Sequence, residues 1–403
     1  GTPVASIQHS RPAGASTEGN EAEPWCRTHR LQTHSTEAVT RSSSGGEMRL
    51  SCIRRVQLLK VLLLATRSRC VHLARPIVRN SMPVRCTASP PAPAPTSTKP
   101  HRAGFISIVG VPNVGKSTLM NCLVGERLAI TTPKAQTTRH RILGIVNGED
   151  FQIVYSDTPG VVVPQYKLHE GMMASVRGSL TDADAVLLTV DVFQEDFVDD
   201  AILRQIERSP GALLVIVNKV DLLREGSPLS ESRRIEIGSE EQILDRWRQK
   251  FPSASVIPVS ATTKVGVDDL FDRLLAVLPE HEPYFPKDQL TDRPERFFAA
   301  EMVREAIMNG YRHEVPYSCE VVVTSFKELE DIIRINCDIY VAQDSQKGII
   351  IGHKGAALKA VGTRARKQLE EFFVKKVYLE TRVKVRRAWR EDTSALKDFG
   401  YLY

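Results

Sequence analysis

The segment from Met48 to Pro100 contains no aspartate or glutamate, whereas arginine recurs in it among leucine, valine, serine and alanine. This composition is typical of an organellar transit peptide. The apolar run from Leu58 to Leu64 is interrupted by Lys60 and is too short to span a membrane. Pro, Ala, Ser and Thr dominate Thr87 to Pro100, which predicts a disordered linker. We therefore expect residues 1–102 to be a transit peptide and linker.

Residues Val84 to Ala88 resemble a chloroplast cleavage region. The expected location is therefore the chloroplast stroma first and the mitochondrion second, with a secretory signal as the weaker interpretation. The first plausible start is Met48, and the sequence leaves open whether residues 1–47 are translated.

Cysteine is scarce, with seven in 403 residues, and neither cysteine nor histidine shows the spacing of a metal site. This pattern implies a reducing compartment. The hydrophobic fraction of 42% is enough for ordinary cores, and the length predicts two or three domains. The formal charge of +6 is a mild indication of a polyanionic partner.

Four short motifs follow one another in the order in which a GTPase chain meets phosphate, magnesium and guanine. They are GVPNVGKS at 110–117, DTPG at 157–160, NKVD at 218–221 and Ser260-Ala261. Each motif is weak evidence alone. Together they predict a guanine-nucleotide site.

The first motif has the composition of a phosphate-binding P-loop. It lies between an expected strand, Phe105–Val109, and an expected helix, Ser117–Val124. Glycines at both ends of the loop allow turns that point backbone N–H groups at phosphate oxygens. Lys116 is expected to reach the β- and γ-phosphates, and Ser117 to ligate Mg²⁺. The predicted phosphate contacts are Gly110, Asn113, Val114, Gly115, Lys116, Ser117 and Thr118.

The second motif supplies a carboxylate. Asp157 follows the expected strand Phe151–Tyr155, so its side chain should hold Mg²⁺ through water while the Gly160 N–H faces the γ-phosphate. A plain β-turn is the alternative for this motif. A threonine in the polar stretch 134–142 could complete the magnesium shell, and the sequence does not choose between its two candidates. The predicted magnesium ligands are Ser117, Thr137, Thr138 and Asp157, and the remaining contacts of the turn are Thr158, Pro159 and Gly160.

The third and fourth motifs predict the choice of base. Asp221 can accept hydrogen bonds from both guanine donors, N1–H and the exocyclic amine, whereas adenine offers no such pair. Asn218 can bond the other polar edge of the purine, and Lys219 can lie over the ring. The Ser-Ala pair follows the expected strand 256–259, where a backbone N–H could meet guanine O6. The predicted guanine contacts are Asn218, Lys219, Asp221, Ser260 and Ala261.

A glutamine that would orient the attacking water is missing. Ras-like enzymes carry it just after the DTPG glycine, but here three valines, 161–163, follow Gly160. We therefore expect slow intrinsic hydrolysis. Asn113 could coordinate a monovalent cation such as K⁺, which would act as an arginine finger does. The predicted catalytic residues are Lys116, Asn113 and Gly160, and the predicted cofactors are GTP or GDP, Mg²⁺ and K⁺.

The C-terminal third predicts a second domain of mixed α and β structure. Expected strands at 320–324 and 332–341 precede expected helices at 357–361 and 363–373. Between them, Gly352-His-Lys-Gly355 matches the Gly-x-x-Gly loop of a KH domain, which clamps about four nucleotides of single-stranded RNA. A solvated basic face is the alternative. The predicted RNA contacts are Lys347, Gly348, Gly352, His353, Lys354, Gly355, Lys359 and Arg366.

These motifs together make residues 103–403 resemble the Era GTPases. The shared segments are GVPNVGKST, KAQTTRHRI, DTPG, NKVD, SA, VPYS at 315–318, DSQKGIIIGHKG and the tail 389–401. The resemblance implies a doubly wound α/β P-loop GTPase domain followed by a smaller α+β type II KH domain. It also implies binding to the 3′ end of small-subunit ribosomal RNA and to the pre-ribosomal small subunit during assembly. No DNA partner and no transmembrane segment are expected, and peripheral membrane contact stays open.

A proline-rich stretch divides the two expected domains. We expect a G domain at 103–280, a linker at 281–294 and a KH domain at 295–403 that opens with a helix from Glu295 to Met308. A short linker predicts that nucleotide state changes the relative orientation of the domains. The expected function is slow GTP hydrolysis coupled to ribosomal RNA binding. The alternative is a non-enzymatic GTP-sensing factor that acts on another RNA.

Overall fold

The computed structural model describes residues 100–197 and 199–402. The predictions about the transit peptide, its cleavage region and the first translated residue concern residues outside this range. In the part of the chain that is described, no helix combines the length and the apolar character needed to cross a membrane.

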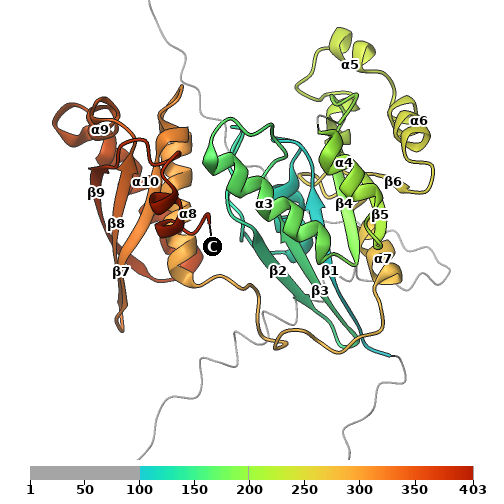
Figure 1. Ribbon diagram of the computed structural model, residues 1–403, viewed down its shortest axis with the longest axis horizontal. Helices are drawn as coiled ribbons and strands as arrows, with labels where there is room; N and C mark the ends of the chain where they lie inside the picture. Colours follow the sequence, from blue (N-terminus) through green and yellow to red (C-terminus); the bar gives the residue numbers. More distant parts are fainter. Residues whose placement is uncertain (1–99, 198, 403) are drawn as a thin grey trace, which may run out of the picture. The chain divides into compact units, whose positions relative to one another are not determined.

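The N-terminal domain is built on a six-stranded sheet with the order β2-β3-β1-β4-β5-β6 (Figure 1). Every neighbouring pair is parallel except β2 and β3, which are antiparallel. The predicted doubly wound, mostly parallel sheet is confirmed. The strands are β1 (Arg102–Val109), β2 (Ile142–Asn147), β3 (Phe151–Asp157), β4 (Ala185–Asp191), β5 (Ala212–Asn218) and β6 (Ser255–Pro258).

Helices cover both faces of this sheet because its central strands are buried on both sides. Side chains of α3, α4 and α6 share one apolar core with alternate residues of β4 and β5, and those of α2 and α7 share the core on the opposite face. The helices are α2 (Lys116–Val124), α3 (Lys167–Thr181), α4 (Asp200–Glu207), α5 (Glu231–Ile237), α6 (Glu240–Lys250) and α7 (Val267–Val277). This arrangement leaves the carboxyl ends of the parallel strands for a ligand.

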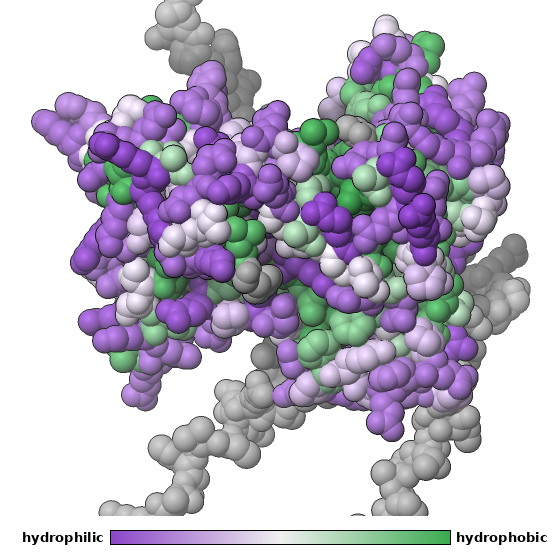
Figure 2. All heavy atoms as spheres, in the orientation of Figure 1, coloured by the Kyte–Doolittle hydropathy of each residue, from purple (hydrophilic) through white to green (hydrophobic). Residues whose placement is uncertain are grey.

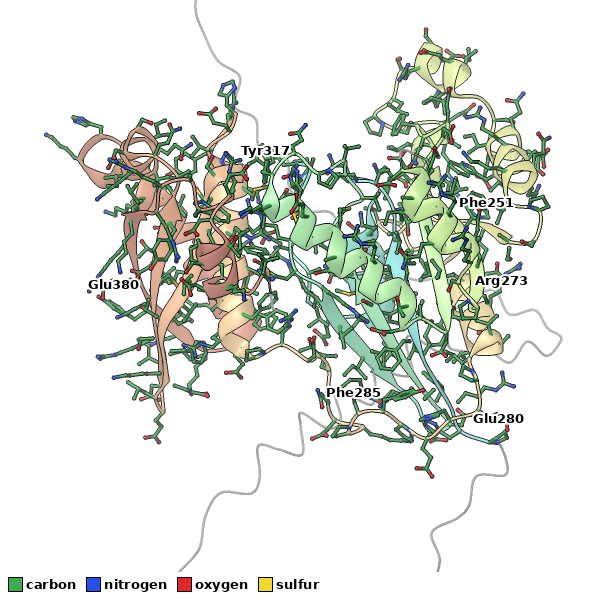
Figure 3. The ribbon with its side chains drawn as sticks, viewed as in Figure 1. Phe251, Arg273, Glu280, Phe285, Tyr317 and Glu380 are labelled. Carbon is green, nitrogen blue, oxygen red and sulfur yellow. The ribbon has the colours of Figure 1, made fainter. Side chains whose placement is uncertain are left out.

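The expected linker runs along the sheet and is hydrogen-bonded to it. Gln152 Oε1 accepts from the backbone N–H groups of Tyr284 and Phe285 at 2.7 and 3.0 Å. Further on, the Ile145 N–H donates to the Leu290 carbonyl at 2.8 Å. Glu280 and Phe285 mark this path in Figure 3. These bonds fasten much of the linker to the first domain, so it is not a free tether.

The C-terminal domain has the predicted order of a type II KH domain. Its sheet, β7-β8-β9, pairs β7 antiparallel and β9 parallel to β8. Residues of α8, α10 and the three strands form its core. The elements are α8 (Glu295–Gly310), β7 (Glu320–Glu328), β8 (Ile332–Val341), α9 (Asp344–Ile351), α10 (Ala356–Phe373), β9 (Lys376–Val385) and α11 (Thr393–Asp398).

One helical prediction differs from the structure. The helices expected at 357–361 and 363–373 are one helix, α10, which runs through Gly362 without a break. A glycine lowers helix propensity but does not remove a backbone N–H, so the i→i−4 bonds continue. The apolar run before Gly352 is the end of a second helix, α9. The Gly-x-x-Gly loop therefore joins two helices.

Candidate functional site

The four N-terminal motifs meet at one edge of the six-stranded sheet. The P-loop follows β1, DTPG follows β3, NKVD follows β5, and Ser260-Ala261 lies just beyond β6. Since these four strands are parallel, their carboxyl ends lie along the same edge. The motifs are far apart in sequence, and the sheet brings them together.

The P-loop has a backbone that only glycine permits at two positions. A Cβ on Gly110 would lie 2.1 Å from the Thr189 carbonyl oxygen. Gly115 has φ +96°, and a Cβ there would lie 2.3 Å from Asn218 Nδ2. Between them Asn113 adopts φ +67° with its side chain exposed, a conformation that asparagine tolerates better than most residues. The loop therefore wraps tightly at both ends and leaves the Asn113 amide accessible.

Lys116 is 6% exposed and its Nζ donates to the Val111 carbonyl oxygen at 2.9 Å. Burial lowers the pKa of Lys116 to about 8, although the nearby Asp157 carboxylate acts in the opposite direction. An anionic ligand in the loop would favour the charged form of this lysine. The ammonium group is thus held inside the loop and is not a solvated surface charge.

An oxygen-rich cluster lies beside Lys116. The Ser117 hydroxyl donates to Asp157 Oδ2 at 2.7 Å and lies 2.7 Å from Thr138 Oγ1, which is 3.3 Å from Asp157 Oδ2. Asp157 is fully buried, and burial raises its pKa to about 6. Its Oδ1 atom has no hydrogen-bond partner among the described residues. Two hydroxyls and a carboxylate with an unpaired oxygen fit the oxygen ligands that Mg²⁺ prefers.

The structure distinguishes the two threonines that the sequence left open. Thr138 lies in the oxygen cluster, whereas Thr137 Oγ1 bonds the Lys134 carbonyl and the Thr132 hydroxyl, each at 2.7 Å. Only Thr138 is therefore placed to meet an ion held by Ser117 and Asp157.

Asn218 ties three loops together. Its Nδ2 donates to the Val114 carbonyl at 2.8 Å, and its Oδ1 accepts from the Ala261 N–H at 3.1 Å. The side chain is 2% exposed. Asn218 therefore connects the loops through these two bonds. The second N–H of its amide is not used by them and can donate to a purine.

The two charged residues of this motif have different surroundings. Lys219 has φ +66°, and its Nζ forms an ion pair with Asp191 Oδ2 at 2.7 Å. Sequence reasoning missed Asp191, although its place at the end of β4 was a usable signal. Asp221 is half-buried, and its carboxylate makes no hydrogen bond or ion pair with any residue that the structure describes. A carboxylate in that position is available to two external donors.

The turn after Asp157 lies against the P-loop. The Val161 N–H donates to the Gly110 carbonyl at 3.0 Å, and a Cβ on Gly160 would lie 2.8 Å from Pro112. Val161 is buried and Val163 is 64% exposed. None of the three valines that follow Gly160 can hydrogen-bond a water through its side chain. The structure places no carboxamide in this turn.

The Gly-x-x-Gly loop lies between α9 and α10, with Gly352 and Gly355 at φ +70° and +79°. His353 and Lys354 are exposed on it. Of the other predicted contacts, Gly348, Lys359 and Arg366 are exposed and Lys347 is half-buried. The face of this domain seen in Figure 2 is mainly hydrophilic.

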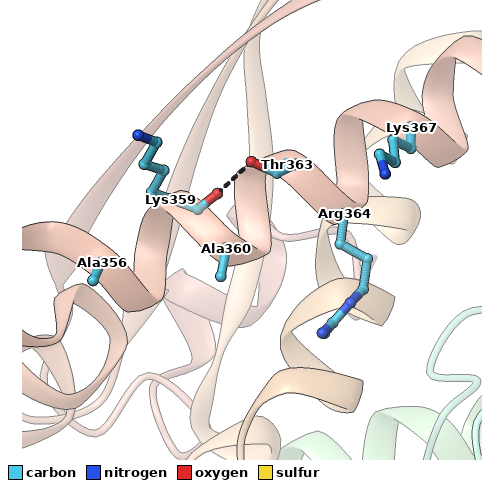
Figure 4. Close-up of a pocket in the computed structure, with 6 residues that line it drawn as sticks. All are labelled: Ala356, Lys359, Ala360, Thr363, Arg364 and Lys367. Carbon is cyan, nitrogen blue, oxygen red and sulfur yellow. Dashed lines mark hydrogen bonds between the residues drawn. The ribbon is translucent and has the colours of Figure 1, made fainter.

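A groove continues from the loop along α10 (Figure 4). Its lining residues all lie on α10, at positions three and four apart that share one helix face. Arg364 Nη1 donates to the Ala306 carbonyl of α8 at 3.3 Å. The groove residues are Ala356, Lys359, Ala360, Thr363, Arg364 and Lys367. Of the predicted RNA contacts, Lys359 lines this groove.

Two protein families match separate parts of the chain. The family described as "50S ribosome-binding GTPase" matches residues 105–219. The family described as "KH domain" matches residues 314–390. These matches agree with the two domains seen in the structure.

Individual relatives match across both domains. The chain is 43% identical over 303 residues to "GTPase Era" of Syntrophus aciditrophicus, which covers 74% of this chain and 95% of that protein. It is 42% identical over 310 residues to "GTPase ERA-like, chloroplastic" of Arabidopsis thaliana, which covers 75% of this chain and 69% of that protein.

Two solved structures are similar over the same region. One is an Aquifex aeolicus Era variant bound to GDP and AlF4⁻, at 37% identity and a TM-score of 0.69. The other is Era in complex with MgGDPNP and nucleotides 1506–1542 of 16S ribosomal RNA, at 36% identity and a TM-score of 0.69. Each comparison covers 75% of this chain and 100% of the other.

Proposed function

This chain belongs to the Era family of GTPases, and we propose that it acts in small ribosomal subunit assembly by binding the 3′ end of small-subunit ribosomal RNA. The observation that carries the proposal is the exposed Gly-x-x-Gly loop between two helices, beside a basic groove, in a chain similar to an Era that holds 16S ribosomal RNA nucleotides. The RNA contacts are Lys347, Gly348, Gly352, His353, Lys354, Gly355, Lys359 and Arg366.

The nucleotide is held along the edge of the six-stranded sheet. Residues 110–118 cradle the phosphates, because the glycine-dependent turns of the loop leave backbone N–H groups for anionic oxygens. Asp221 accepts from guanine, and Asn218 holds the loops on which the base rests. Lys116 neutralises phosphate charge during hydrolysis, and the Gly160 N–H faces the γ-phosphate.

Ser117, Thr138 and Asp157 hold the magnesium ion, which screens phosphate charge when it is bound. Thr138 belongs to a segment that orders around the γ-phosphate, so it contributes to the GTP complex more than to the GDP complex. Of the two threonine candidates, we assign the role to Thr138 alone, since the Thr137 hydroxyl is bonded within its own loop.

The domain limits that we propose are 103–280 for the G domain, 281–294 for the linker and 295–403 for the KH domain. The plant relatives named chloroplastic support a chloroplast location, and we place the protein in the stroma. Residues 1–102, which include the stretch 48–100 without Asp or Glu, are proposed as the transit segment and linker.

A direct test of this function maps the bound RNA. The chain should be crosslinked to plastid RNA in the presence of a non-hydrolysable GTP analogue, and most crosslinks should fall at the 3′ end of the small-subunit ribosomal RNA. Multiple-turnover phosphate release should be measurable and should rise when an oligonucleotide of that 3′ end is added. Crosslinks mainly to messenger RNA, with no phosphate release, would support the non-enzymatic alternative instead.

A monovalent cation is proposed to supply the transition-state charge that no side chain after Gly160 provides. Hydrolysis should then be several-fold faster in K⁺ than in Na⁺ at equal ionic strength. Asn113→Ala should remove that difference, because the exposed amide would no longer coordinate the ion. The measurement is the rate of phosphate release in the two salts. Equal rates for the unmodified chain would show that no monovalent cation takes part in hydrolysis.

A further inference from the structure

The residue after Thr138 is Arg139, and its side chain is buried against the KH domain. Arg139 is 2% exposed. Its Nη1 donates to the Cys319 carbonyl at 2.7 Å and to Glu320 Oε2 at 3.0 Å, and its Nη2 donates to the Tyr317 carbonyl at 3.0 Å. Tyr317 is labelled in Figure 3. A G-domain side chain is therefore enclosed by groups from a segment about 180 residues away.

The enclosing groups are themselves fixed. Glu320 is 5% exposed, and its Oε2 also accepts from the Tyr401 hydroxyl at 2.7 Å. The Arg139 guanidinium lies 5.8 Å from the Trp389 ring, which is fully buried. Further hydrogen bonds help a buried ion pair to hold one geometry. Here the Cys319 and Tyr317 carbonyls and the Tyr401 hydroxyl supply them, whereas Arg139 Nε has no hydrogen-bond partner among the described residues.

The peptide on the other side of Thr138 is also bonded to the KH domain. The Thr137 carbonyl accepts from Arg304 Nη2 at 2.5 Å. Arg304 is fully buried on α8 and donates to both Glu301 oxygens, at 2.8 and 2.5 Å. The carbonyl before Thr138 and the side chain after it are thus both held by the second domain.

We propose that Arg139 is a positioning residue for the GTPase site. The KH domain holds the Arg139 guanidinium, and through it sets Thr138 Oγ1 beside Ser117 and Asp157, where a GTP-bound magnesium ion would be met. The inference rests on the magnesium role proposed above for Thr138. It makes the RNA-binding domain part of the nucleotide site, because that domain supplies the groups that bond the Arg139 guanidinium and the Thr137 carbonyl.

The main test removes both charges of the pair. Arg139→Met combined with Glu320→Leu leaves no unpaired buried charge, so the domain can still fold. We expect the affinity for a non-hydrolysable GTP analogue to fall about tenfold, with the Mg²⁺ concentration for half-saturation rising by a similar factor, within the usual range of coupling between sites. The GDP affinity should stay within about twofold, because GDP does not engage Thr138. Fluorescent analogues of both nucleotides give these values.

A matched control removes a different ion pair between the same domains. Arg127 Nη2 lies 2.5 Å from Glu305 Oε2, and Arg127 is outside the segment that holds Thr138. Arg127→Gln should keep the original preference for the GTP analogue over GDP. If it loses that preference as strongly as the double variant, the general domain contact and not Arg139 is responsible.

Two further variants keep the outcomes separate. Thr138→Ala should reproduce the loss; if it does not, the proposed magnesium role itself is wrong. Should the double variant fail to show a thermal unfolding transition, Tyr401→Phe removes one hydrogen bond to Glu320 and should give a smaller loss in the same direction. A folded double variant, or Tyr401→Phe in its place, with unchanged analogue affinity and Mg²⁺ dependence overturns the proposal.

Discussion

Replacing Asp221 with asparagine should shift the preference of this chain from GTP toward XTP. The carboxylate has no partner among the described residues, so its two acceptor sites are available to guanine donors. The asparagine oxygen can still accept one bond, but its NH2 group faces the other guanine donor and the charge is gone. This loss should cost about 3 kcal/mol or more, which is over a hundredfold in GTP affinity. The asparagine amide can donate to the additional carbonyl of xanthine, so XTP should gain affinity. Equilibrium binding of fluorescent GTP and XTP to the purified variant measures both changes.

The control for this variant is another carboxylate of the same domain. Asp269 is exposed on α7, where it pairs with Arg273 at 3.0 Å. Asp269→Asn should leave both nucleotide affinities unchanged. Undiminished GTP binding by Asp221→Asn would remove the NKVD motif from the guanine site.

Replacing His353 and Lys354 with aspartate should abolish most RNA binding. The two acidic groups would lie where the loop approaches the phosphates, while the flanking glycines keep the backbone in its turn. We expect the affinity for a ribosomal 3′-end oligonucleotide to fall by about 2 kcal/mol or more, roughly 30-fold, at physiological salt. GTP affinity and basal hydrolysis should remain, and RNA stimulation of hydrolysis should disappear.

The matched control changes charge elsewhere in the same domain. Lys327 and Arg334 face each other across β7 and β8, and both are exposed. Replacing both with aspartate alters the net charge at least as much as the loop variant does. If this control weakens RNA binding equally, or if the loop variant binds RNA as well as the unmodified chain, the loop has no specific role and the basic surface is only solvated.

The choice of nucleotide and the presence of two domains could be predicted from sequence because the information is local. A strand, a glycine-bounded loop and a helix are adjacent in residues 105–124, and backbone sterics require glycine at positions 110 and 115. Likewise the apolar runs 105–109 and 151–155 predict buried strands, which the structure contains as β1 and β3. The limits of individual helices were predicted less accurately than their existence. The single helix α10 was expected as two, because Gly362 resembles a break in the pattern.

Only the tertiary structure shows which of Thr137 and Thr138 lies beside Ser117 and Asp157. Both threonines have the same side chain and adjacent positions, and the difference between them is the direction in which each points once Ser117 and Asp157 have been brought beside them. The same holds for Asn218, whose two hydrogen bonds connect loops more than 40 residues apart. Composition and periodicity describe neighbours along the chain, and these contacts depend on how the strands are ordered in the sheet.

By itself the sequence determined that this protein is a GTPase with a KH domain, because it contains the P-loop, DTPG and NKVD motifs and a basic Gly-x-x-Gly loop. What only the tertiary structure decided is how the second domain reaches the first site. In the sequence, Arg139 is one positive charge among others in a polar stretch. In the structure its guanidinium is buried, because Cys319, Glu320 and Trp389 surround it. That burial depends on contacts between residues about 180 positions apart in the sequence, which no local pattern of side chains encodes.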